Sequence, residues 1–200
     1  ILTAMEFERL LTSAGPTGGD IVRPSDGKHP KNIVFVLCVG SRDRNAYSYC
    51  SRFCCMYSIK HAFQALDHGV KDVTVLYMDV RAYGNGFDAF WQRTEQEGAK
   101  FLRGKPSRIS ADGDRIRIRF EDTDPGKTKI IEADMVVLAN AVQPPAGLAG
   151  LADVLGLGMG KDGFIQVDES RVGPVFTPRP GVYLAGCAGG PKDIPDSVAE

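Results

Sequence analysis

The feature that most constrains this chain is a buried-strand pattern followed by a glycine turn and a helix. The run Ile33–Leu37, with the sequence IVFVL, has the length and the β-branched content of a buried parallel strand. A turn with Gly40 follows, and from Cys55 to Leu66 apolar residues recur on one face of a helix. Dinucleotide-binding units begin with strand, glycine turn and helix. The segment therefore predicts a Rossmann-like domain.

The remaining pattern extends this prediction to an α/β fold. Thr3 and Glu6 fit a capping box at the start of a short helix, and a further helix is expected over 87–98. Apolar and charged residues alternate over 107–120 around Asp112-Gly113, which predicts a solvated antiparallel meander beside a parallel sheet. The expected strands are residues 33–37, 73–78, 100–102, 107–120, 128–132, 135–140 and 164–167.

Four cysteines stand where a glycine fingerprint would follow the first strand, at Cys38, Cys50, Cys54 and Cys55. Iron–sulfur clusters are held by thiolates, usually four, taken from one dense run and a distant member. The nearby arginines and the following helix N-terminus would favour an anionic group, the helix end by roughly 0.3–1 kcal/mol. Two other interpretations are open: buried or redox thiols, and a zinc site.

Composition narrows the function classes. The 200 residues are 43% hydrophobic and 24% charged, with a formal net charge of −1, which argues against a nucleic-acid partner held by bulk charge. No apolar run approaches a membrane span and no leader is seen, so we expect a cytoplasmic protein. Five cysteines then indicate metal or redox chemistry rather than disulfides. Because the first residue is not Met, we expect a fragment of a longer polypeptide.

Two sets of polar residues are expected to be structural. His61 and His68 lie on or beside the cysteine helix without a partner at metal-binding spacing, so we expect them at the surface or at a cap. The arginines at 115, 117 and 119 are expected on the solvated face of the meander.

The sequence also resembles a known family through four motifs. These are CVGSRD from Cys38, YCSRFCCMYSIKHA from Tyr49, YMDVRAYGNGF from Tyr77 and GVYLAGCAGGPKDIPDSVAE from Gly181. Together they resemble the A subunits of CoB–CoM heterodisulfide reductases and their relatives in sulfate reducers, over almost the whole chain. Members of that family are iron–sulfur flavoproteins on a thioredoxin-reductase-like core.

The resemblance implies a domain order. In this family a nicotinamide-type domain is inserted into the FAD domain. The chain then divides into a connector at 1–29, a Rossmann-like inserted domain with the cysteines at 30–145, and a C-terminal part of the FAD domain at 146–200.

The resemblance also implies cofactors and their ligands. A [4Fe–4S] cluster would bind the four cysteines named above. FAD would contact Gly186, Cys187, Lys192, Asp193 and Ile194. Related reductases carry an Asp where this chain has Cys187, which has the alternative role of a small buried residue at a tight turn. NAD is not expected because no glycine fingerprint follows the first strand, and the FAD pyrophosphate site is expected upstream of Ile1.

These observations predict an electron-transfer part of an oxidoreductase that passes electrons between FAD and the iron–sulfur clusters of partner subunits. The fragment alone is expected to be inactive. The alternative is a non-catalytic cysteine-rich α/β domain that scaffolds a complex. Convergence of Cys50, Cys54 and Cys55 with Cys38 would separate the two. The electron donor, the acceptor and any electron bifurcation are left open by the sequence.

Overall fold

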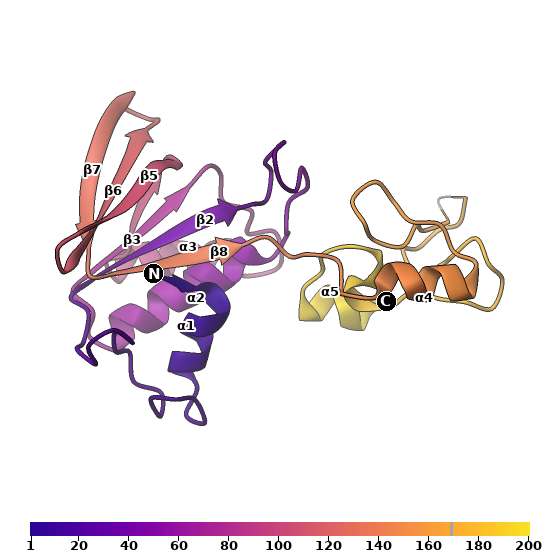
Figure 1. The fold of residues 1–200 in the computed structure, drawn as a ribbon, viewed down its shortest axis with the longest axis horizontal. Coiled ribbons are helices and arrows are strands. Elements are labelled where there is room, and N and C mark those ends of the chain that lie inside the picture. Colours follow the sequence, from indigo (N-terminus) through magenta and orange to yellow (C-terminus); the bar gives the residue numbers. More distant parts are fainter. Residues whose placement is uncertain (169) are drawn as a thin grey trace. The chain divides into compact units, whose positions relative to one another are not determined.

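The structure is a computed structural model that describes residues 1–168 and 170–200 (Figure 1). The chain forms two compact units. Unit 1 contains Ile1–Val39 and Cys54–Asn140, and unit 2 contains Gly40–Phe53 and Ala141–Glu200. Each unit has its own apolar core, so each is described by itself.

Unit 1 is built on a five-stranded parallel sheet in the order β1-β8-β2-β3-β4. Its strands are β1 (Leu2–Thr3), β2 (Asn32–Val39), β3 (Asp72–Tyr77), β4 (Lys100–Arg103) and β8 (Met135–Asn140). In β2 and β3, Ile33 pairs with Val73 and Phe35 pairs with Val75. This confirms the predicted parallel sheet. The inner residues of β2 are buried, as a nearly continuous apolar run requires of a strand covered on both faces.

Three helices belong to this unit: α1 (Ala4–Leu11), α2 (Cys54–Asp67) and α3 (Phe87–Gln96). The predicted capping box begins α1: the Glu6 N–H donates to Thr3 Oγ1 at 3.3 Å, and the Thr3 N–H donates to the Glu6 carboxylate at 2.6 Å. Helix α2 ends just before Gly69, whose φ of 83° is the left-handed conformation common after helices.

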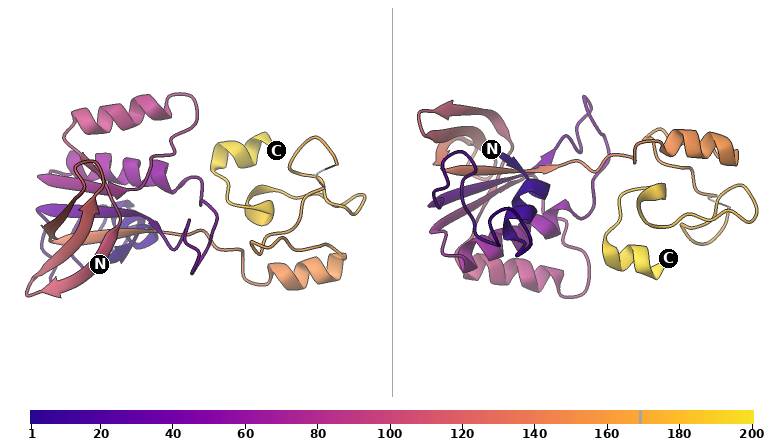
Figure 2. Two further views of the ribbon diagram at one scale, coloured as in Figure 1. Left: turned by 90° about the horizontal axis from the view of Figure 1, so that it is seen from above. Right: turned by 60° about the horizontal axis from the view of Figure 1, so that its bottom comes forward.

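The two faces of the parallel sheet are covered by different layers, as the two views of Figure 2 show. Phe35 and its neighbours on one face pack against α1 and α2, where Phe7 meets Phe35 edge to face at 5.4 Å. Val34 and Val36 on the other face pack against an antiparallel sheet. That sheet consists of β5 (Pro106–Asp112), β6 (Arg115–Asp122) and β7 (Lys127–Ala133), and confirms the predicted meander.

Unit 2 consists mainly of loops around a small core. Its described helices are α4 (Leu148–Leu155), the 3₁₀ turn η1 (Gly186–Gly189) and α5 (Ile194–Ala199). The strand predicted at 164–167 is wrong: Ile165 makes only a single bridge, to Met159. The Ile165 N–H donates to the Ala188 carbonyl, and the Gln166 N–H donates to the Gly158 carbonyl. Loops therefore provide the hydrogen-bond partners that a neighbouring strand would provide in a sheet.

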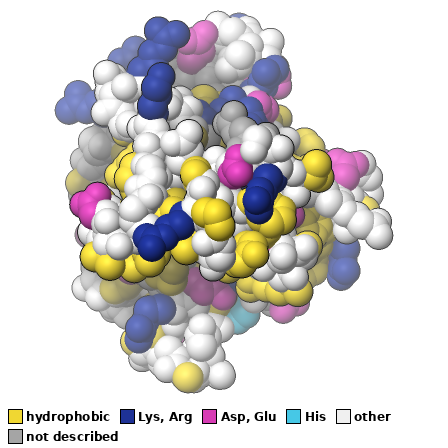
Figure 3. Space-filling model, turned by 90° about the vertical axis from the view of Figure 1, so that its right-hand side faces the viewer, with side chains coloured by type: hydrophobic (Ala, Val, Ile, Leu, Met, Phe, Trp, Pro, Cys, Tyr) yellow, Lys and Arg dark blue, Asp and Glu magenta, His cyan; other side chains and the backbone are white. Residues whose placement is uncertain are grey.

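Several large apolar side chains of unit 2 are exposed, and hydrophobic side chains gather on the face seen in Figure 3. They are Leu151, Val154, Val172, Tyr183, Ile194 and Val198. Among the described residues, no helix combines the length and the apolar character that crossing a membrane requires.

The predicted domain division at 29/30 and 145/146 concerns a longer protein and stays a prediction. Within the chain, β1 belongs to the parallel sheet because it pairs with β8, and α1 belongs to the same unit.

Truncating the Phe35 side chain tests the packing of unit 1. Phe35 is 1% exposed, between α1 and α2. We expect Phe35→Ala to lower the free energy of unfolding by about 3–5 kcal/mol, through lost burial and the cavity left behind. Urea denaturation followed by circular dichroism measures the change. The matched control is Ile130→Ala, at a β7 position that is 58% exposed, where a loss as large would contradict the assigned core.

Candidate functional site

Three of the four predicted ligand cysteines meet in the core of unit 1. Cys38 lies near the end of β2, and Cys54 and Cys55 begin α2. All three are at most 2% exposed and belong to one apolar cluster. The Cys54 side chain hydrogen-bonds with those of Cys38 and Cys55. We call these three residues the cysteine triad.

The backbone of Cys38 explains how its thiol reaches this cluster. Strict alternation along β2 would place Cys38 on the same face as Val34 and Val36, away from α2. Instead the register shifts between Val36 and Val39, and Cys38 has a φ of 57°. Both Leu37 and Cys38 therefore join the cluster on the α2 side. Placing a non-glycine residue in the left-handed backbone region costs roughly 1–2 kcal/mol of conformational free energy. Such strained residues are concentrated at functional sites.

The pKa values of Cys54 and Cys55 are shifted in opposite directions. Hydrogen bonds with Cys38 and Cys55, together with burial, raise the pKa of Cys54 far above that of a free thiol. The pKa of Cys55 is lowered, because its sulfur accepts a hydrogen bond from Cys54 and another from the Arg81 backbone, against the effect of burial. Of Cys54 and Cys55, the second therefore holds a negative charge more readily. The N-terminus of α2 carries a partial positive charge, which favours a thiolate at Cys55, and no acidic residue in the first turn opposes this effect.

The fourth predicted ligand, Cys50, lies in unit 2 on the loop Gly40–Phe53, and its side chain is half-buried. The Arg52 N–H donates to Cys50 Sγ at 3.3 Å, and the Arg52 guanidinium donates to Asp196 at 2.8 Å. Arg52 has a φ of 62°, so it shares the left-handed backbone of Cys38 and Arg42, which also precede α2. Since Cys50 is four residues before Cys54, the chain limits the distance between their Cα atoms to about 14 Å.

The donor chemistry of the triad suits a soft, thiolate-binding group. Among the described residues, however, no group of three or more His, Cys, Asp or Glu is already arranged to hold a metal ion. The four-cysteine ligand set therefore stays a prediction.

The predicted flavin segment of unit 2 is organised by its own hydrogen bonds. Gly186 has a φ of 56°, and its N–H donates to the Glu200 carboxylate at 3.0 Å. The same carboxylate pairs with the Lys192 ammonium, and both side chains are only 7% exposed. The Cys187 thiol donates to the Lys192 carbonyl at 3.5 Å. Asp193 caps α5 by accepting the N–H of residue 196 at 2.8 Å, and Ile194 is exposed.

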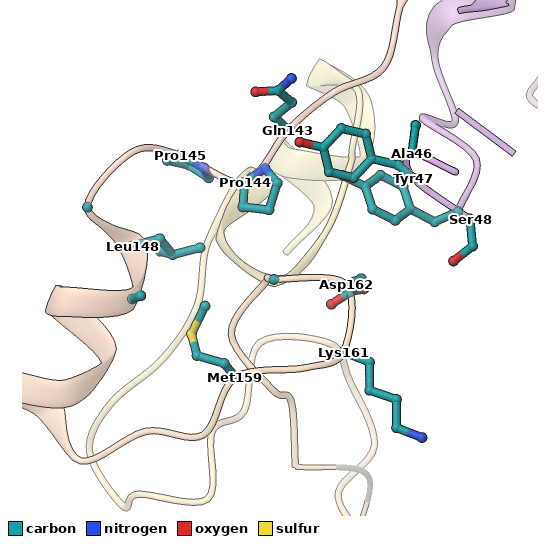
Figure 4. A pocket seen from close by; sticks show the side chains of 14 residues that line it. Ala46, Tyr47, Ser48, Gln143, Pro144, Pro145, Leu148, Met159, Lys161 and Asp162 are labelled. Carbon is teal, nitrogen blue, oxygen red and sulfur yellow. The ribbon is translucent and has the colours of Figure 1, made fainter. Parts of the chain in front are cut away.

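A cavity of about 660 Å³ opens elsewhere in unit 2, as Figure 4 shows, and contains none of the predicted site residues. Tyr47, Pro144 and Met159 are among its lining residues. It also touches a feature that the sequence reasoning missed, the spacing G-x-G-x-x-G at 158–163. Because this run lies in a loop with neither a strand before it nor a helix after it, it lacks the structural context of a dinucleotide site.

The expectation for His61 is wrong. The residue is 1% exposed, because α1 covers this side of α2 and its Glu8 reaches the imidazole. His68 is exposed and its Nδ1 contacts the Gln64 carbonyl, as expected of a capping group. Arg117 and Arg119 of the meander are exposed, as expected, and Arg117 pairs with Asp112 at 2.7 Å. Arg115 is half-buried and lies 3.8 Å from Glu132.

The amino-acid sequence of the chain is similar to those of A subunits of heterodisulfide reductases. It is 45% identical over 205 residues to the A subunit of the H₂:CoB–CoM heterodisulfide,ferredoxin reductase of Methanothermobacter thermautotrophicus. It is 44% identical, also over 205 residues, to the iron–sulfur A subunit of the CoB–CoM heterodisulfide reductase of Methanocaldococcus jannaschii. Both alignments cover 100% of this chain, which spans only 31% of each relative. No protein-family profile matches the chain.

The fold resembles thioredoxin reductases. The T. acidophilum thioredoxin reductase matches 83% of this chain and 47% of its own, with a TM-score of 0.55 and 19% identity. The Lactococcus lactis thioredoxin reductase matches 82% of this chain and 46% of its own, with a TM-score of 0.52 and 18% identity. At these identities the likeness establishes the architecture, and confirms the α/β fold predicted from the sequence.

The burial of the triad predicts a graded thiol reactivity. In the native, reduced chain, iodoacetamide should label the half-buried Cys50 and Cys187 first, while the triad reacts only when the protein opens, since a buried thiol is shielded from the reagent. Tryptic mass spectrometry over time measures each site, and labelling in urea provides the fully reactive reference. Labelling of Cys38 as fast as that of Cys50 would contradict the placement of the triad.

Proposed function

We propose that this chain, a homologue of about one third of the heterodisulfide reductase A subunit, is an electron-transfer segment of an iron–sulfur flavoprotein oxidoreductase. The observation that carries the proposal is the convergence of the cysteine triad. Three thiols from two elements share one buried cluster, and one of them reaches it only through a strained backbone. An ordinary apolar core would not require that strain.

The ligands that we propose for a [4Fe–4S] cluster are Cys38, Cys54 and Cys55 with Cys50 as the fourth. When bound, such a cluster supplies one-electron transfer. The chain's residues would neutralise and shield its charge: the N-terminal N–H groups of α2 face an anion favourably, and the Arg52 N–H already donates to Cys50.

The flavin contacts that we propose lie in unit 2, at Gly186, Cys187, Lys192, Asp193 and Ile194. The Gly186 N–H and the buried Lys192 ammonium already converge on one carboxylate, which is the kind of environment that binds an anionic group. FAD exchanges electrons in pairs, so single electrons would pass through clusters to partner subunits. The alternative of a non-catalytic scaffold gives no reason for a buried thiol triad, so the triad supports electron transfer.

Cluster assembly tests the ligand set. The anaerobic chain, supplied with ferrous iron and sulfide, is expected to bind about four irons, as a [4Fe–4S] cluster contains, and to give a cluster signal in electron paramagnetic resonance after reduction. Each of Cys38→Ser, Cys54→Ser and Cys55→Ser should lose most of the bound iron and sulfide, because a hydroxyl is a poor ligand for this group.

Cys187→Ser is the matched control, because it alters a half-buried cysteine outside the ligand set and should keep the full iron content. Wild-type protein without acid-labile sulfide, or serine variants with unchanged iron, would reject the proposal.

Nicotinamide dinucleotide should bind poorly. Such a ligand needs a short glycine turn that admits the pyrophosphate to a free helix N-terminus. Here the long loop Gly40–Phe53 separates β2 from α2, and thiols occupy the helix start. Isothermal titration with NADH should show no dissociation constant below about 100 µM. A low-micromolar constant would show that the nucleotide site is retained.

A further inference from the structure

His61 is a buried imidazole with one unused nitrogen. The ring lies in an aromatic cage, with its centroid 5.2 Å from that of Phe7, 6.3 Å from Phe35 and 5.7 Å from Tyr57. Within the described residues its Nδ1 is fully buried and has no hydrogen-bond partner. Leaving a buried polar atom unpaired costs about 1–3 kcal/mol, so such an atom calls for an explanation.

The other ring nitrogen of His61 contacts a charged pair. Nε2 lies 2.5 Å from a carboxylate oxygen of Glu8 on α1, and the Lys60 ammonium lies 2.6 Å from the same oxygen. Burial lowers the pKa of His61, and Glu8 opposes that effect. The neutral ring therefore donates its Nε2–H to Glu8, which leaves the Nδ1 lone pair free for a proton. The Glu8 side chain is 41% exposed, so the carboxylate that contacts the buried imidazole also contacts the solvent.

The cage connects His61 with the cysteine triad. Phe7 and Phe35 of the cage belong to the same apolar cluster as the triad, and Tyr57 on α2 packs against that cluster. The Tyr57 ring therefore contacts both this cluster and the His61 ring. In such a dry, apolar cluster, charges act on one another more strongly than in water.

We propose that His61 is a redox-linked proton acceptor: it takes up a proton at Nδ1 when the negative charge held by the cysteine triad increases. The inference rests on the proposed function, since reduction of a thiolate-bound cluster is what adds that charge. The balance is one electron from an external reductant and one proton from solvent, which forms the Nδ1–H bond. The O–H bond of the hydronium ion that gives up the proton is the bond that breaks, and no other covalent bond changes.

The groups that face His61 determine whether this uptake is favourable. From α1, Glu8 would compensate the imidazolium that forms. From α2, Lys60 opposes it, while burial keeps the Tyr57 hydroxyl neutral. From β2, the uncharged ring of Phe35 contacts His61, and the same strand carries Cys38 of the triad. The one change in charge therefore comes from the triad.

The test is the pH dependence of the reduction potential of the cluster-loaded chain. A tenfold change in proton concentration shifts a one-electron potential by at most about 59 mV, so the wild-type potential should fall with pH by up to that slope between about pH 5 and 8. His61→Phe, which keeps an aromatic ring in the cage, should give a potential independent of pH. Glu8→Gln should move the sloping region to lower pH, because the compensating carboxylate is lost.

The matched control is His68→Phe, which removes an exposed histidine just beyond the same helix and should keep the wild-type slope. If His61→Phe does not fold, ¹⁵N NMR of wild type and Glu8→Gln decides: Nδ1 should gain a proton on reduction in wild type. A loaded wild type with a flat profile, an unchanged slope in His61→Phe, or an Nδ1 unprotonated in both oxidation states overturns this inference alone. A chain that never binds iron and sulfide overturns the proposed function, and this inference with it.

Discussion

The contact between the end of β2 and the beginning of α2 is the interaction on which the chemistry of unit 1 depends. It requires Cys38 to leave the regular alternation of its strand and accept a left-handed backbone. The strain is tolerated because the strand on one side and the helix on the other are fixed by extensive packing around Phe35. A rigid sheet and helix can hold one residue in a conformation that a loop would relax.

Burial then makes the thiols of the triad interact strongly. In water three thiols would titrate almost independently, but in an apolar cluster a proton on Cys54 stabilises charge on Cys55. The same burial withholds the triad from solvent reagents. The packing that shapes the site therefore also sets where its charge resides.

The sequence allowed the framework to be predicted more fully than the site. Buried parallel strands were visible because runs such as Ile33–Leu37 are apolar throughout, and the capping box of Thr3 and Glu6 is a local signal. The face of Cys38 was not predictable, because a bulge breaks the period of two on which such reasoning rests. His61 was misjudged because its burial depends on Glu8, 53 positions away, and no local pattern carries that contact. In unit 2, the run Phe164–Val167 has strand composition but no partner strand among the described residues.

The strand–turn–helix of this chain uses a familiar physical device for a different ligand type. In a dinucleotide-binding unit, the N-terminal N–H groups of the helix meet a pyrophosphate through a glycine turn that leaves space for it. Here the loop Gly40–Phe53 replaces that short turn, and the first residues of α2 are themselves cysteines. The positive end of the helix therefore acts on the side-chain sulfur atoms of its own first two residues. Since this field lowers the energy of any negative charge at the triad, we argue that the fold keeps its anion-binding geometry while the sequence changes the anion from phosphate to thiolate.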